Sequence, residues 1–394
     1  MAALDLSRPV FWLFLGLAIL LLTPQVTGRG RRITLCLLNL GFIAAVLGSA
    51  CALGAVSYGA AVHGFGWIGC TSRMTKPWQR IARGTGWVAL LLMFLVHKGP
   101  GTLTADWALQ PMKTFMVGIG FSFVLLRTLD RLRWPSRAPA RPPTLLDTLN
   151  YLFPFHMLAA GPIQSWNDFS SQPQAPPVLD RGRVLQGLHR LANGLFMKFV
   201  LADLLQHSFL TGFRSPFPYQ FFEMQVFYLW LLLDFAGYSS LAVGAGILMG
   251  VATPENFNAP LLARNILEFW ERWHLTLTAC IRKHLFYPVQ MTLLRRTGGR
   301  RVAQVTTVSL LLAFLACGLW HRFSVPFLAW GLVHAGGVLV FVAYRGWLQK
   351  RLGQERMTAY RANRWVRAVA MLLTYEFVAT SLLLIARPRC LPWP

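Results

Sequence analysis

Long runs without a charged side chain recur along the whole chain. The uninterrupted runs are residues 9–28, 33–72, 148–167, 235–254, 302–321 and 323–344. Shorter or once-interrupted apolar runs lie near residues 84–97, 112–126, 191–213, 219–234, 265–290 and 368–386. Because a helix needs about 20 apolar residues to cross a bilayer, the pattern predicts an all-α polytopic membrane protein with roughly ten to twelve transmembrane or re-entrant helices.

The run 148–167 differs from the others because it contains helix breakers. Pro154 and the pair Gly161-Pro162 interrupt it, and proline inside a helix removes a hydrogen bond and clashes with the preceding turn. Irregular backbone is tolerated at membrane depth only where protein or a water-filled cavity surrounds it. We therefore expect a broken or re-entrant element here, lining a cavity.

Composition supports a membrane-embedded chain. Of 394 residues, 55% are hydrophobic and 13% are charged, and the formal net charge is +24. In a soluble protein this charge would suggest nucleic acid, but the arginines lie mainly in short connections such as 29–32, 130–141 and 295–301. We interpret them as loops that face anionic lipid, with no nucleic-acid partner. The orientation of the chain in the membrane stays open.

Several reaction classes are excluded by missing motifs. The chain has no GxSxG elbow, Walker A loop or HExxH motif, which argues against serine hydrolases, nucleotide-hydrolysing enzymes and zinc proteases. The six cysteines have no CxxC spacing, so neither a metal site nor a disulfide framework is expected.

Aromatic and charged residues concentrate between residues 254 and 290. A continuous helix would place Trp270, Trp273, His274 and Leu277 on one stripe. An i, i+4 ladder on another face would be formed by Arg264, Glu268 and Arg272. The pattern fits an interfacial amphipathic helix with a hydrogen-bonded core histidine, and it also fits a site in which His274 is functional.

A second candidate site lies in CGLWHRFSVPFLAWGLVHAGG, residues 317–337. His321 ends one uncharged run and only Arg322 separates it from the next. It could cap a helix, or it could act as a general base, because a neutral imidazole accepts a proton near neutral pH. For His334, thirteen residues on, we favour a packing role.

The chain resembles the membrane-bound O-acyltransferase family, in its bacterial branch that includes alginate O-acetyltransferase and the membrane protein of teichoic acid D-alanylation. The resemblance runs from about residue 117 to 337, more than half of the chain. The blocks that carry it, in the family's order, are VGIGFSF, FPFHMLAAGPIQSWNDF, GLFMKFVLAD, LDFAGYSSLAVGAGILMG, TPENFNAP, FWERWHLTL, GLWH and WGLVHAG.

The resemblance implies a helical membrane core around a central funnel or tunnel. It implies that His321 is the catalytic residue and His274 its partner. The wall or support positions that it implies are Asp234 and Tyr238. Trp270, Trp273 and Trp320 could line the passage, although packing is their default role. On this basis we predict one membrane domain over 1–394, with N-terminal spans at 1–110, a catalytic core at 111–345 and a C-terminal helix and tail at 346–394.

Two positions depart from the family pattern. The family usually has glycine where this chain has Arg322, and often Arg-Asp where it has Arg282-Lys283. Both changes make the site more positive, so Arg322 and Arg282 are candidates to bind a phosphate or carboxylate of a substrate. The resemblance therefore transfers the reaction class more securely than the substrate.

The expected function is acyl transfer, acetyl or D-alanyl, from a cytoplasmic thioester, acetyl-CoA or a carrier-bound acyl group, to a hydroxyl of an extracytoplasmic glycan, glycolipid or secreted product. No bound cofactor is expected. The expected surroundings are membrane lipid of a bacterial inner membrane and a separate extracytoplasmic esterase-like partner protein. The alternatives are a transporter or flippase that relays protons through buried His and Asp, and an inactive scaffold.

Overall fold

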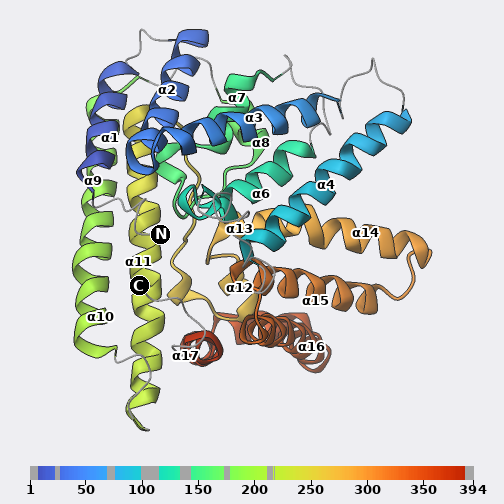
Figure 1. The fold of residues 1–394 in the computed structure, drawn as a ribbon. Helices are drawn as coiled ribbons and strands as arrows, with labels where there is room; N and C mark the ends of the chain where they lie inside the picture. The colour runs from blue at the N-terminus through green and yellow to red at the C-terminus, as the bar shows by residue number, and fades with distance from the viewer. Residues whose placement is uncertain are drawn as a thin grey trace. The chain divides into compact units, whose positions relative to one another are not determined.

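The computed structural model describes residues 8–22, 27–68, 76–98, 115–133, 143–172, 178–210, 216 and 218–386. Over these ranges every regular element is a helix (Figure 1). The chain forms two compact units, one of Met1–Gly194 with Tyr238–Pro254 and one of Leu195–Gly237 with Glu255–Pro394. The boundaries predicted at residues 110 and 345 stay predictions.

The first unit holds mainly the N-terminal helices. They are α1 Pro9–Leu21, α2 Gly28–Leu47, α3 Ser49–Ile68, α4 Lys76–Lys98, α6 Phe121–Leu132, α7 Leu145–Leu152, α8 Trp166–Ser170 and most of α9 Arg181–Phe196. The uncharged run 33–72 is divided between α2 and α3 at Gly48, whose φ of 91° lies in the region that favours glycine. One sequence run thus supplies two helices.

The segment after α7 confirms that the predicted element is broken, whereas its place beside a cavity stays a prediction. It consists of a short 3-10 helix, Phe155–Met157, a turn, and irregular backbone with a cis bond between Gly161 and Pro162. The fully buried Arg127 of α6 donates to the carbonyls of Leu152 (3.2 Å), Met157 (3.1 Å) and Pro162 (2.9 Å). One guanidinium therefore supplies the donors that a helix would have provided to this backbone.

The second unit carries the long C-terminal helices. Its elements are the π-helical stretch η5 Met197–Ala202, α10 Asp203–Phe209, the first part of α11 Tyr219–Met249, η6 Pro260–Leu262, α12 Ile266–Trp270, α13 Leu275–Ile281, the π-helical stretch η7 Arg282–Phe286, α14 Tyr287–Arg296, α15 Val302–His321, α16 Val325–Ala362 and α17 Arg364–Ala386. The last turns of α11, from Tyr238, belong to the first unit.

Two glycines bring α15 and α16 together next to their connection. A Cβ atom added at Gly318 would collide with the carbonyl of Phe327, and one added at Gly331 with the carbonyl of Phe314. Small residues allow helix backbones to approach closely in membranes, where packing stabilises helix pairs. The two helices are antiparallel, so the first turns of α16 lie beside the last turns of α15.

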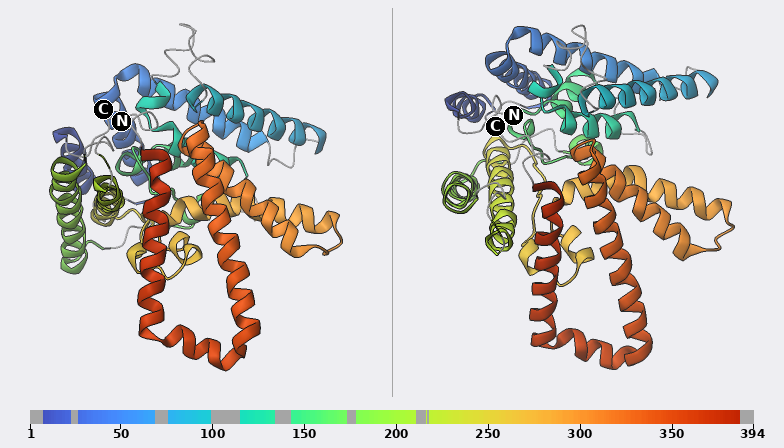
Figure 2. Two further views of the ribbon diagram at one scale, coloured as in Figure 1. Left: turned by 90° about the horizontal axis from the view of Figure 1, so that it is seen from below. Right: turned by 60° about the horizontal axis from the view of Figure 1, so that its bottom comes forward.

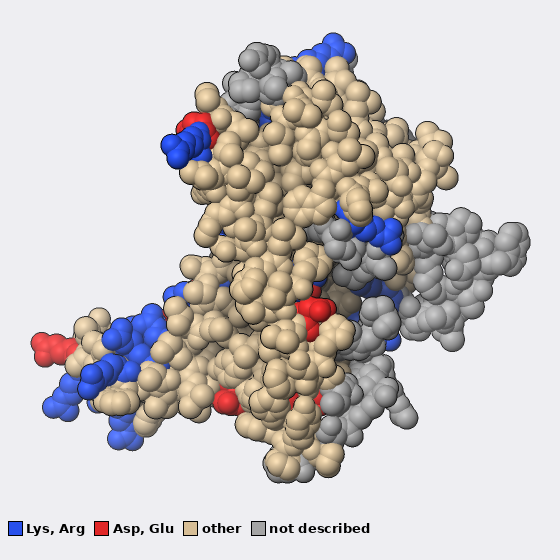
Figure 3. All heavy atoms as spheres, turned by 90° about the vertical axis from the view of Figure 1, so that its left-hand side faces the viewer, with Lys and Arg blue, Asp and Glu red and all other residues tan. Residues whose placement is uncertain are grey.

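A kink at Gly353, with φ of 69°, divides α16. Beyond it the chain turns crosswise and α17 returns alongside α16 (Figure 2). Lys and Arg side chains gather at the end of this hairpin, at the lower left of Figure 3.

Five helices of the described ranges are long and apolar enough to cross a membrane, namely Gly28–Leu47, Tyr219–Met249, Val302–His321, Val325–Ala362 and Arg364–Ala386. The predicted runs 219–234 and 235–254 merge into α11. The predicted first run, 9–28, contains α1, which has only 13 residues. The structure thus supports an all-helical membrane protein, whereas the predicted total of roughly ten to twelve helices and the central tunnel stay predictions.

Candidate active site

The two histidines singled out from the sequence lie in different local settings within the second unit. His321 is the last residue of α15 and is half-buried. His274 lies between two short helices, so the continuous helix predicted around it is wrong. Helix α12 ends at Trp270, a turn follows, and His274 itself has φ of 44° before α13 begins at Leu275. A positive φ is uncommon outside glycine, so this turn needs support from elsewhere in the fold.

That support comes from the extended segment before η6. Its Asn256 accepts the Leu275 N–H at 2.9 Å through the backbone carbonyl. The side-chain Oδ1 of Asn256 accepts from the Thr276 hydroxyl at 2.6 Å and lies 3.3 Å from His274 Nδ1. Because an amide oxygen can only accept, Nδ1 carries the proton in this contact and Nε2 is left as the basic nitrogen.

The predicted charge ladder is present despite the broken helix. Glu268 pairs with Arg264 at 3.1 Å and with Arg272 at 2.9 Å. Burial by itself would raise the pKa of Glu268, but the hydrogen bonds from Arg264 and Arg272 outweigh it and lower this pKa. The ladder also ties this turn to the segment of Asn256, because Arg272 Nη1 donates to the carbonyl of Asn258 at 3.1 Å.

Trp320 lies next to both imidazoles. Its ring centroid is 4.8 Å from that of His321 and 6.3 Å from that of His274. Burial lowers the pKa of His274 well below its usual value, and the nearby charge of a protonated His321 lowers it further. His274 is therefore neutral near pH 7, and the two rings do not readily carry protons together.

Further aromatic rings surround His321 and continue toward α12. Trp330 meets the His321 ring edge-on at 5.7 Å, and Phe327 stacks on it at 6.1 Å. Trp330 also lies 4.6 Å from His334, whose Nε2 pairs with the Ser381 hydroxyl at 2.9 Å. His334 thus joins α16 to α17, in agreement with the packing role favoured from the sequence.

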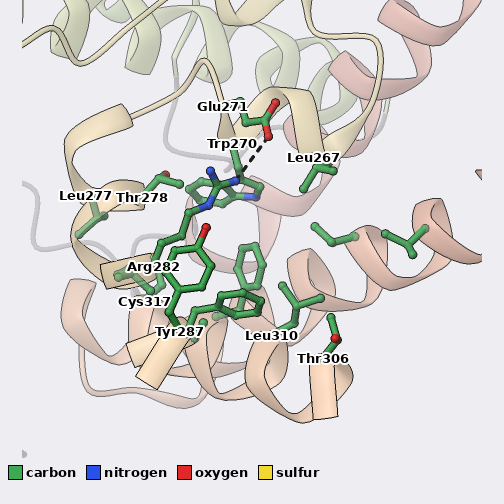
Figure 4. A pocket seen from close by; sticks show the side chains of 16 residues that line it. Leu267, Trp270, Glu271, Leu277, Thr278, Arg282, Tyr287, Thr306, Leu310 and Cys317 are labelled. Atoms are coloured by element: carbon green, nitrogen blue, oxygen red, sulfur yellow. Dashed lines mark ion pairs between the residues drawn. The ribbon is translucent and has the colours of Figure 1, made fainter. Parts of the chain in front are cut away.

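A pocket of about 360 Å³ lies beside this cluster, within the second unit (Figure 4). Its lining is mostly apolar and comes from α12, α13, η7, α14, α15 and α16. The wall formed by α15 consists of Thr306, Leu310, Ala313, Phe314 and Cys317. These residues recur at helical spacing, and His321 lies one turn beyond Cys317 on the same face.

The polar part of the pocket contains two of the predicted substrate-binding residues. Arg282 pairs with Glu271 at 3.6 Å, and Trp270 lies beside them (Figure 4). Buried in the lining, Trp270 Nε1 and Thr278 Oγ1 have no hydrogen-bond partner among the described residues. Buried polar atoms usually have partners, so these two atoms are exceptions within the pocket lining.

Two further predicted residues are chain neighbours of the histidines, Trp273 of His274 and Arg322 of His321. Trp273 packs on Phe269, with ring centroids 5.6 Å apart. Arg322 is half-buried and caps α15 through its backbone, and its N–H donates to the Gly318 carbonyl at 3.1 Å.

The two residues expected to form walls or supports have separate partners. Asp234 pairs with Lys198. Tyr238 belongs to the first unit, where its hydroxyl accepts the N–H of Ala160 at 3.1 Å. The structure therefore gives Tyr238 a contact to the broken segment rather than to the histidine pair.

A family model described as the membrane-bound O-acyltransferase family, MBOAT, matches residues 84–383. The match covers both histidines, the pocket and most of the helices of the second unit. The chain belongs to the membrane-bound O-acyltransferase family. It is accordingly an O-acyltransferase and a membrane protein. In the described part of the chain, no group of three or more His, Cys, Asp or Glu side chains is placed to hold a metal ion.

Individual members of the family are similar to this chain over different lengths. A teichoic acid D-alanyltransferase of Streptococcus thermophilus is 25% identical over 400 residues, which cover 96% of this chain and 94% of the relative. A peptidoglycan O-acetyltransferase of Helicobacter pylori is 32% identical over 50% of this chain and 38% of its own length. A probable alginate O-acetylase of Pseudomonas fluorescens is 30% identical over 68% of this chain and 52% of its own.

Asn256, Thr278 and Trp330 are the site residues that sequence reasoning missed. Asn256 and Trp330 lie in the motif blocks TPENFNAP and WGLVHAG, which was a signal that they face the core. Neither block indicates which histidine the residue contacts, because those contacts join segments that are far apart in the chain.

We expect Asn256→Ala to lower kcat at least about tenfold with little change in the KM for the donor, because His274 would lose the acceptor that orients its ring. Asn256→Asp keeps an acceptor and adds a negative charge, which raises the pKa of His274. If neutral His274 is required, the acid limb of the pH–rate profile then moves to higher pH. The matched control is Asn258→Ala, at an exposed position of the same segment. Equal kcat values for Asn256→Ala and the control would refute a positioning role.

Proposed function

We propose that this protein transfers an acetyl or D-alanyl group from a phosphopantetheine thioester, carried by coenzyme A or by a carrier protein, to a hydroxyl of an extracytoplasmic glycan or glycolipid. The observation that carries the proposal is the position of His321. It lies one helical turn beyond Cys317, the last α15 residue of the pocket wall, and has the neutral imidazole of His274 nearby.

The pocket suits the arm of such a donor. Its volume lies within the range usual for small-molecule sites. Phosphopantetheine is a narrow chain with amide groups along it, and amide oxygens could accept hydrogen bonds from Trp270 Nε1 and Thr278 Oγ1. A second, shallower hollow shares Arg282 with the pocket and adds Lys283. These two cations are suited to the phosphate at the end of the arm.

The reaction requires one proton acceptor and an aligned donor. A thioester carbonyl is already activated, so His321 would take the proton of the acceptor hydroxyl as its oxygen attacks that carbonyl. The tetrahedral intermediate then expels the thiolate, which receives the proton from the His321 imidazolium. A positioned base of this kind contributes about 10²- to 10⁴-fold, and orientation of the two substrates supplies much of the remainder.

The relatives support the substrate classes without fixing one. Their names state D-alanyl transfer for teichoic acid and acetyl transfer for peptidoglycan and alginate. On the basis of these names, we propose that the protein is a bacterial inner-membrane enzyme that modifies an envelope or secreted polymer. A separate esterase-like partner outside the membrane is part of the same proposal.

The donor pocket can be tested with one substitution in its wall. Ala313→Phe adds a ring inside the pocket, and we expect it to raise the KM for labelled acetyl-CoA or acyl carrier protein at least about tenfold. Val308→Phe adds the same ring on the exposed face of α15 and serves as the control. If the thermal melt shows that Ala313→Phe is unfolded, Ala313→Val gives a smaller obstruction. Donor KM values that match the control in every folded pocket variant would refute this assignment of the pocket.

A further inference from the structure

The connection between α16 and α17 has a fixed place relative to a bilayer. Both helices are candidate spans, and α16 turns crosswise at Gly353 before α17 begins at Arg364. Large apolar side chains are exposed on both helices next to this connection, among them Val340 at 70% and Leu373 at 64%. Because these side chains belong in hydrocarbon, residues 345–367 lie at one membrane surface. We refer to residues 345–367 as the elbow.

The elbow is strongly basic. Its charged residues are Arg345, Lys350, Arg351, Arg356, Arg361, Arg364 and Arg367, with Glu355 as the single acid. All of these cationic side chains are exposed, and the structure gives none of them an ion pair among the described residues. The described part of the chain therefore leaves this charge unneutralised.

Two exposed tryptophans lie among these charges. Trp347 is 53% exposed and Trp365 67% exposed. Each is covered by a guanidinium, Arg351 at 5.7 Å and Arg364 at 5.3 Å from the ring centroid. Tryptophan favours the headgroup region of a bilayer, and an arginine at that depth meets phosphate. An acidic protein would account for the cations, but not for tryptophans placed between two membrane spans.

We propose that the elbow binds the headgroups of anionic phospholipids at the cytoplasmic face of the membrane. Clusters of four to eight Lys or Arg directly beside a transmembrane helix are typical of such binding. The proposal is independent of the proposed acyl transfer, because neither the histidines nor the pocket enters it.

The proposal also assigns an orientation to the second unit. Helix α16 begins directly after His321 and crosses about 30 Å of bilayer before it reaches the elbow. The basic turn between α14 and α15, with Arg295 and Arg301, lies at the elbow end of the antiparallel α15–α16 pair. If basic connections face the cytoplasm, His321 lies toward the other side of the membrane.

Energy transfer from a fluorescent amino acid at Gln354, an exposed elbow position, would test the proposal. The full-length protein is reconstituted in vesicles of equal parts phosphatidylcholine and phosphatidylglycerol, with a trace of one lipid carrying an acceptor on its acyl chain. We expect transfer to labelled phosphatidylglycerol to exceed transfer to labelled phosphatidylcholine about twofold, and 1 M salt to remove the difference. A donor at Phe323, at the other end of α16, should show no such excess.

The charge dependence is tested at the same positions. The variant Lys350→Gln, Arg351→Gln, Arg356→Gln, Arg361→Gln should lose the preference for phosphatidylglycerol. Its matched control, Lys350→Arg, Arg351→Lys, Arg356→Lys, Arg361→Lys, keeps every charge and should retain it. Equal transfer to the two lipids in the unsubstituted protein would overturn the proposal and direct the search to an acidic protein partner. A preference that survives the Gln substitutions would overturn it as well.

Discussion

His321→Ala is expected to lower kcat for acyl transfer by at least about 10²-fold, and up to 10⁴-fold, without changing the thermal melt. His321 is half-buried and the structure surrounds it with Trp320, Phe327 and Trp330, which can pack around a smaller side chain. The loss should therefore fall on the chemical step. The measurement is transfer of label from acetyl-CoA or an acyl carrier protein to an alcohol acceptor, with the purified protein in detergent.

The control for this prediction is His207→Ala. His207 lies on α10 with 72% of its side chain exposed, so its removal should leave both rate and melting temperature unchanged. Unreduced label transfer in His321→Ala would exclude His321 as the base. Acceptor movement across a membrane that continues in this variant, driven by an ion gradient, would instead favour a transporter.

Arg127→Leu is expected to lower the free energy of unfolding by about 3 kcal/mol or more, the usual consequence of removing one partner from a buried charged network. The guanidinium donates to three buried carbonyls of the broken segment, and leucine satisfies none of them. The substitution should lower the temperature of the thermal melt in detergent, and activity should fall only in proportion to the unfolded fraction.

A matched substitution at an exposed arginine separates this effect from loss of charge. Arg181 begins α9 in the same unit and is exposed, so Arg181→Leu should change the melt little. Arg127→Lys keeps the charge but not the branched set of donors, and we expect it to remain well below the unsubstituted protein. Equal melting temperatures for the Arg127 and Arg181 variants would show that the broken segment does not depend on this guanidinium.

The two irregular segments show how far local sequence could predict the fold. The break after α7 was predictable, because Pro154 and Gly161-Pro162 disfavour a helix whatever surrounds them. The break before His274 was not, because residues 264–281 have helical periodicity and contain no proline or glycine. There the backbone of Asn256 accepts the Leu275 N–H, and the N–H of Asn258 donates to the Arg272 carbonyl at 2.9 Å. A tertiary contact overrides the local pattern.

The candidate site, too, was predictable only in part from local sequence. The motif blocks indicated the family and both histidines, since these residue types stand in short recognisable stretches. Helical spacing alone put His274 on a stripe with Trp270 and Trp273, whereas the turn gives it Asn256 as a partner. Tyr238 lies only four residues after Asp234 in the chain, yet the structure places it in the other unit.

Chain composition was sufficient to establish a helical membrane protein, because insertion into a bilayer depends on about 20 consecutive apolar residues and on little else. Helix-breaking residues established where one apolar run could not be straight. The neighbours of each imidazole, the pocket along α15 and the exposed elbow required the folded chain. They depend on distant backbone segments meeting at hydrogen-bond distance, and no local run of residues specifies such a meeting.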